Sequence, residues 1–177
     1  MVQAMTVAIL VMAVLPALLA AAGAFDLMSY TIPNIIPGAM IALFIPFMVI
    51  IALSGGMSWS EIGLHLLGGA VGLAAGMALF AAGWVGGGDA KLFAAAMLWL
   101  GWDALLEYTI MASILGGVLT FALLALRRVP LPSFLVKQPW LAHLSDHKAG
   151  VPYGVALAAA ALLVLPDTRV FQIASGG

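Results

Sequence analysis

The chain has 177 residues, of which 65% are hydrophobic and only 7% are charged, and its net charge is −1. Soluble domains carry charge on about a quarter of their residues and disordered chains are also rich in charge, so both classes are excluded. The balance of charge gives no basic field for nucleic acid, and the absence of cysteine excludes disulfides and thiol chemistry. We therefore predict an all-α protein embedded in the lipid bilayer, with one domain over residues 1–177.

Apolar runs of about 20 residues, the length that crosses a bilayer, follow one another from the start of the chain. The first extends from residue 4 to 25, and a polar break with Pro33 follows at residues 26–34. The second extends from residue 35 to 53, and we expect Pro46 inside it to bend or tilt the helix.

A third run, at residues 62–85, carries Gly68, Gly72 and Gly76 at intervals of four residues. Residues four apart lie on one face of a helix, and glycines there let another helix approach closely. We expect this face to be a helix–helix contact. The alternative is that lipid-facing helices simply tolerate glycine.

Three more runs complete the predicted spans: residues 90–100, which form a short run, residues 104–126 and residues 151–165. Basic residues concentrate near Lys91 and at residues 127–150, and Lys and Arg near span ends favour the cytoplasmic side. Two crossings must lie between two cytoplasmic connections, so the short run counts as a span and the prediction is about six. On this topology residues 26–34 are also cytoplasmic. The opposite boundary would be marked by anchoring tryptophans, Trp59, Trp99 and Trp102.

Two of the seven acidic residues, Asp26 and Asp89, fall at predicted cytoplasmic helix junctions. Acids at membrane depth are costly and tend to be functional. Two close carboxylates share one proton, so the ionised one can activate water while the neutral one protonates a peptide group. Helix dipoles would favour Asp89 as the base, at a helix start, and Asp26 as the acid, at a helix end. The alternative is that Asp89 only caps a helix and Asp26 only marks a boundary.

Gly86, Gly87 and Gly88 directly precede Asp89. Glycines permit turn conformations closed to other residues and let a substrate backbone come close, so we predict Gly86 and Gly88 to form an active-site loop. The run lacks the Gly-Lys-Ser/Thr ending of a phosphate-binding loop, so no nucleotide is expected. Lys91 could keep Asp89 charged, but residues two apart do not share a helix face, which favours a boundary role.

Three sequence elements resemble those of the type IV prepilin peptidase family. They are Asp26 followed by Ile32-Pro33-Asn34, the segment Gly86-Gly87-Gly88-Asp89-Ala90-Lys91, and Pro152-Tyr153-Gly154. The resemblance implies a multi-pass aspartic endopeptidase of the bacterial inner membrane, with Asp26 and Asp89 as the catalytic pair at the cytoplasmic face and no cofactor. Its partner would be a pilin-like precursor, cut between a basic leader and a hydrophobic helix.

The chain departs from the family pattern in two respects. Many relatives have basic residues just after the first aspartate, where this chain has Leu-Met-Ser-Tyr-Thr at residues 27–31. The resemblance therefore does not define which leader sequence the protein prefers. Longer relatives also carry an N-terminal segment with paired cysteines and an N-methyltransferase activity. Because this chain begins with its first predicted helix and has no cysteine, it resembles the short form associated with tight-adherence (Flp-type) pili, and we expect no methylation.

The same residues also allow other functions. A small proton-coupled transporter or channel could use the acids as proton carriers, and a non-catalytic scaffold is a third possibility. Inverted-repeat transporters have matching broken helices in both halves, and the proline-bearing second run has no counterpart in the second half. His143 and His147 have the spacing of two metal ligands, but Pro139 favours a solvated loop, so no metal site is expected.

Overall fold

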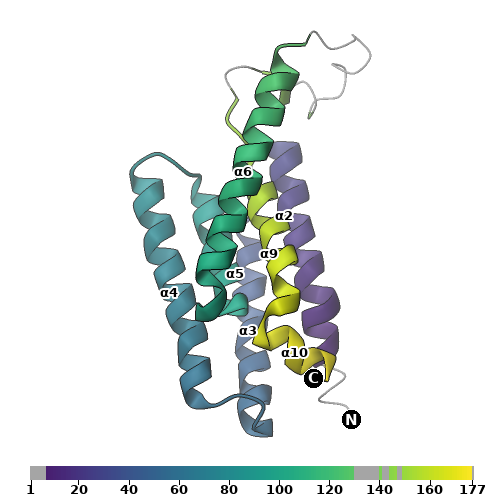
Figure 1. Ribbon diagram of the computed structural model, residues 1–177, viewed down its shortest axis with the longest axis vertical. Helices are drawn as coiled ribbons and strands as arrows, with labels where there is room; N and C mark the ends of the chain where they lie inside the picture. The colour runs from purple at the N-terminus through teal and green to yellow at the C-terminus, as the bar shows by residue number, and fades with distance from the viewer. Residues whose placement is uncertain (1–6, 130–139, 141–143, 147–148, 177) are drawn as a thin grey trace.

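The computed structural model describes residues 7–129, 140, 144–146 and 149–176, and within them all regular structure is helical. Figure 1 shows the long helices side by side in a bundle. Four are long and apolar enough to cross a membrane: Val7–Ser29, Ile35–Ser54, Trp59–Ala81 and Trp102–Arg127. Tyr153–Asp167 and Arg169–Ser175 are bent by 59° and add a fifth crossing if the pair is counted as one span, so four or five described helices have the length and composition of a span against the six predicted. The prediction of an all-α polytopic membrane protein is confirmed.

The elements follow the predicted order. They are the π-helix η1 (Leu10–Val14), α2 (Leu15–Ser29), α3 (Ile35–Ser54), α4 (Trp59–Ala81), α5 (Gly87–Leu100), the 3-10 helix η2 (Trp102–Ala104), α6 (Leu105–Arg127), α9 (Tyr153–Val164), η3 (Leu165–Asp167) and α10 (Arg169–Ser175). The short α10, which the sequence analysis did not predict, begins where the Thr168 hydroxyl accepts a hydrogen bond from the Phe171 N–H. α3 continues as one helix through Pro46.

The predicted break at residues 26–34 begins too early. α2 continues through Asp26 to Ser29, because no proline or glycine interrupts residues 26–29. The helix ends at Tyr30, whose φ of 53° is left-handed, and the Tyr30 N–H donates to the Asp26 carbonyl oxygen at 2.8 Å. Asp26 therefore lies in the last turn of a helix and not in a loop.

The predicted short crossing is α5, which has 14 residues. At 1.5 Å per residue it is about 21 Å long, less than the roughly 30 Å of a bilayer hydrocarbon core. α5 lies inside the bundle, where it packs against α3, α4 and α9, and its Leu92 and Met97 are fully buried. The protein therefore combines its long spans with one short helix that other helices surround.

Trp99, on α5, is not an interfacial anchor as the sequence analysis expected. Its side chain is 1% exposed, its indole Nε1–H donates to the Met40 carbonyl oxygen at 2.9 Å, and its ring packs against Phe44 and Phe47. Trp59 is 81% exposed, as an anchor at the membrane boundary should be. Hydropathy alone cannot distinguish the buried Trp99 from the exposed Trp59, because a tryptophan at a helix end can face either the lipid or the protein core.

The predicted glycine face of α4 is confirmed as a helix contact. Gly68, Gly72 and Gly76 are buried, and each faces α5 or the turn after it. A Cβ at Gly76 would lie 3.0 Å from the Cα of Ala90. The two helices can pack along their length because α4 presents backbone, not side chains, at this face.

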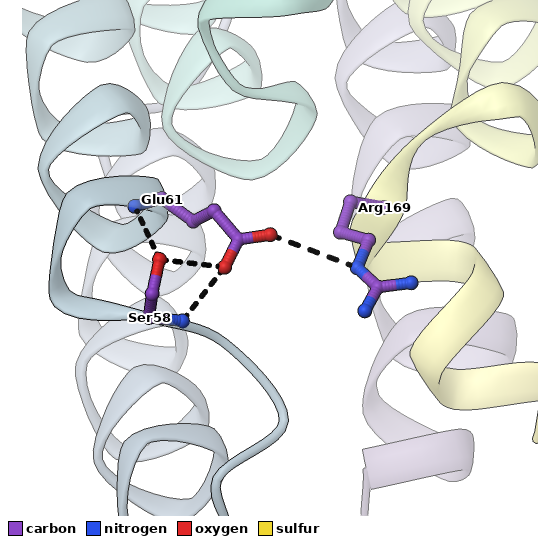
Figure 2. Close-up of polar contacts among 3 residues, drawn as sticks. All are labelled: Ser58, Glu61 and Arg169. Atoms are coloured by element: carbon purple, nitrogen blue, oxygen red, sulfur yellow. Dashed lines mark hydrogen bonds and ion pairs between the residues drawn. The ribbon is translucent and has the colours of Figure 1, made fainter.

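The start of α4 and the helix α10 lie at the lower end of the bundle in Figure 1, and polar residues of both meet there. Figure 2 shows Ser58 and Glu61 capping the start of α4: the Ser58 N–H donates to Glu61 Oε2 at 2.7 Å, and Arg169 Nε lies 3.9 Å from Glu61 Oε1. Glu61 and Arg169 line a cavity of about 310 Å³ together with the buried His65, whose Nδ1 is 2.9 Å from the Leu98 carbonyl oxygen. These contacts connect α4 to α10 and α5 at the end opposite Asp26.

We expect Gly76→Leu to lower the free energy of unfolding by about 1–3 kcal/mol, because the added side chain would collide with the α5 backbone. Gly63→Leu on the same helix is the matched control, since a Cβ there meets nothing within 4 Å. Unfolding of the purified protein in detergent, followed by circular dichroism, measures both changes. Equal stability of the two variants would contradict the close α4–α5 contact.

Candidate active site

The two predicted acids lie at the same end of the bundle. Asp26, from α2, and Asp89, from α5, line one cavity of about 200 Å³. Its other lining residues come from the turn after α2 and the start of α5: Tyr30, Thr31, Ile32, Asn34, Gly86, Gly87 and Gly88. The cavity therefore brings together two acids that are far apart in the sequence with the glycine segment before Asp89.

Asp26 is 5% exposed and is held by the start of α9. Its Oδ2 accepts a hydrogen bond of 2.7 Å from the backbone N–H of Gly154. α2 and α9 pack along each other, which brings Gly154 to this carboxylate. A buried carboxylate needs such donors, because lipid and apolar side chains supply none.

Asp89 lies in the first turn of α5, and its Oδ2 accepts a hydrogen bond of 3.1 Å from the Gly86 N–H. This is the bond that the third helical residue makes in a capping box, so Asp89 does stabilise the helix start, although the N-cap itself is Gly86. Asp89 nevertheless also lines the cavity beside Asp26. The capping hydrogen bond fixes the orientation of the Asp89 carboxylate and is compatible with an acid–base role for it.

Residues 86–88 do not adopt the turn conformations that the sequence analysis expected of glycine. The glycine with positive φ in this region is Gly83, at 74°, whereas α5 already begins at Gly87. Gly88 instead matters for close approach: a Cβ there would lie 3.2 Å from the Cβ of Ile32. The missing side chain lets the start of α5 rest on the turn after α2.

Ile32 also contacts the start of α9. A Cβ at Gly154 would lie 2.6 Å from Ile32 Cδ1 and 2.8 Å from Asp26 Oδ2. The Ile32 side chain, which is 7% exposed, thus sits between Gly88 and Gly154. No pattern in the sequence assigns a physical role to Ile32 or Gly154. The feature that could have pointed to them is their position in the Ile-Pro-Asn and Pro-Tyr-Gly elements.

Lys91, on α5, is hydrogen-bonded to Asn34, which lines the cavity. Its Nζ donates to Asn34 Oδ1 at 2.8 Å, joining residues 57 positions apart. The boundary role assigned from the sequence is therefore incomplete, because Lys91 also connects α5 to the end of the turn after α2. His143 and His147 lie outside the described residues, and within the described part no group of three or more His, Cys, Asp or Glu could hold a metal.

We expect Gly154→Ala to destabilise the protein by about 1–3 kcal/mol, because the new methyl group would displace Ile32 or the Asp26 carboxylate. Gly150→Ala is the control, since a Cβ there meets nothing within 4 Å. Detergent unfolding of the two variants against wild type measures the difference. A Gly154→Ala protein as stable as the control would contradict the contact described here.

The Lys91–Asn34 hydrogen bond predicts a coupling between the two positions. In a double-mutant cycle with Lys91→Met and Asn34→Ala, we expect the combined loss of stability to be smaller than the sum of the single losses by about 0.5–1 kcal/mol. Unfolding free energies of the four proteins give the coupling. Strict additivity would show that the bond does not form in the membrane protein.

Comparison with known proteins places the chain in a family. No curated protein and no solved structure matches it significantly. The type IV leader peptidase family matches residues 13–121, which is more than half of the 177 residues and includes both Asp26 and Asp89. This chain belongs to the type IV leader peptidase family.

Proposed function

We propose that the protein is an aspartic endopeptidase that removes the basic leader from pilin-like precursors of the Flp/Tad type, just before their hydrophobic helix. The observation that carries the proposal is the cavity in which Asp26 and Asp89 meet. Membership of a leader peptidase family supports peptide hydrolysis, and supports it over proton transport by the same acids. Gly86 and Gly88 line this cavity with the acids and, in this proposal, form the loop beside which the substrate backbone lies.

The proposed reaction needs one proton between the two acids. Ionised Asp89, favoured by the positive end of the α5 dipole, takes a proton from water as the water oxygen bonds to the peptide carbonyl carbon. Protonated Asp26, at the negative end of α2, donates its proton to the carbonyl oxygen. Collapse of the tetrahedral intermediate breaks the C–N bond, and the amine leaves with the proton that Asp89 had taken. Asp26 takes back one hydroxyl proton of the intermediate as the C=O bond re-forms, which restores both acids. The products are the leader carboxylate and a new N-terminus on the pilin helix.

The proposed location is the bacterial inner membrane, with the cavity at the cytoplasmic face. Three basic residues support it: Lys91 at the start of α5, and Arg127 and Arg128 at the end of α6, at the upper end in Figure 1. Lys and Arg at span ends favour the cytoplasmic side. A basic leader would then arrive from the compartment in which it was synthesised.

We expect Asp26→Asn and Asp89→Asn each to lower cleavage by at least about 100-fold, because each removes one half of the acid–base pair. The assay uses proteoliposomes and a synthetic precursor with a basic leader followed by an apolar helix of about 20 residues. Product is measured by mass spectrometry. Asp103→Asn, in the 3-10 helix η2, is the matched control and should retain activity.

The proposal fails if either variant, shown to be folded by its unfolding curve, cleaves the precursor at the wild-type rate. It also fails if the wild-type protein leaves this precursor uncut. Cleavage at a bond other than the one before the apolar helix would retain the peptidase and overturn the assigned substrate.

A further inference from the structure

A third cavity, of about 420 Å³, begins at Asp89 and continues as a groove between α4 and α6. α4 packs mainly on α5, and α6 mainly on α9, so the floor of the groove is formed by α5 and α9. Asp89 lines both this groove and the cavity that contains Asp26. The two cavities therefore meet at one of the two proposed catalytic acids.

The groove is lined by apolar atoms although hydroxyl groups occur along it. The Thr109 and Ser113 hydroxyls each donate to a carbonyl oxygen of α6 itself, at 2.7 Å, and the Tyr153 hydroxyl donates to the Ala112 carbonyl oxygen at 3.2 Å. These donors are already engaged within the protein. An apolar occupant would therefore lose no hydrogen bond by lying there.

The groove has the length of a short piece of helix. Its lining on α4 extends from Val71 to Leu79 and on α6 from Leu105 to Ser113, about 12 Å in each case at 1.5 Å per residue. About two turns of a helix cover this distance, at 5.4 Å per turn. Ala75, a small and exposed residue of α4, lines the groove and leaves it open.

From the meeting of the two cavities at Asp89, we propose that the groove seats the first two turns of the precursor's hydrophobic helix while the leader lies in the cavity with Asp26. This inference rests on the proposed function, in which the cut bond directly precedes that helix. The chain of such a precursor changes from polar to apolar at the cut bond, and the protein changes in the same way on the two sides of Asp89. The precursor matches the protein in polarity on both sides of Asp89 and in the position at which the polarity changes. A lipid chain would match only the apolar side, so we favour the precursor helix as the occupant.

The test compares one substitution at neighbouring positions of α4. Both Ala74 and Ala75 are exposed, but only Ala75 belongs to the groove lining. We expect Ala75→Leu to lower cleavage of the helix-bearing precursor by about tenfold or more, because the larger side chain takes space that the precursor helix needs. Ala74→Leu should leave this cleavage unchanged. A second substrate, a soluble peptide that ends shortly after the cut bond, should be cleaved equally by wild type and both variants.

The two substrates separate failure of this inference from failure of the proposed function. If wild type cleaves neither substrate, the peptidase assignment itself is wrong. If wild type cleaves the full precursor and Ala75→Leu cleaves it equally well, the groove does not hold the helix. Equal losses on both substrates would mean that Ala75→Leu disturbs the acids and would also overturn the inference.

Photocrosslinking identifies the occupant directly. A photoreactive residue at Leu106, in the groove, should crosslink to the first two turns of the precursor helix in the Asp26→Asn protein, which holds the precursor uncut. The same probe at Ile114, exposed on α6 outside the groove lining, is the control. Crosslinks from Leu106 to lipid only, or equal precursor crosslinks from both positions, would overturn the proposal.

Discussion

The arrangement of the candidate site depends on one close approach, in which the side chain of Ile32 is held between Gly88 and Gly154. Gly88 precedes Asp89 on α5, and the Gly154 N–H binds the Asp26 carboxylate. The same contact therefore brings both acids to one cavity. A Cβ at Gly88 or at Gly154 would force Ile32, or at Gly154 also the Asp26 carboxylate, to move. Inside a packed bundle such movement is costly.

Much of the fold could be predicted because apolar runs in a membrane protein must form helices that satisfy their own backbone. The ends of α3 and α6 lie within a residue or two of the expected positions, at Ser54 and Arg127. Hydropathy could not show which helix the others surround, and it therefore placed Trp99 at the membrane boundary. It also missed α10, whose seven residues are too few to form a span of their own.

The candidate acids could be named from the sequence because charge is rare in this chain, Asp26 precedes the Ile-Pro-Asn element and Asp89 follows the three glycines. Their surroundings could not be predicted in the same way. The Gly154–Asp26 and Lys91–Asn34 hydrogen bonds join residues 128 and 57 positions apart, and a linear pattern gives residue types but not long-range pairing. The glycines before Asp89 were expected for their turn freedom, whereas the structure uses Gly88 for contact.

The hydrogen bond between Asp26 and Gly154 has a consequence for biosynthesis. α2 leaves the ribosome early, whereas its partner α9 follows more than a hundred residues later. Until α9 is inserted, Asp26 has no Gly154 N–H, and the turn at Ile32 has only one of its two glycine neighbours. Asp26 therefore gains its backbone donor only when α9 has been inserted, so a chain that ends before α9 would place its first helices in the membrane without this part of the candidate site.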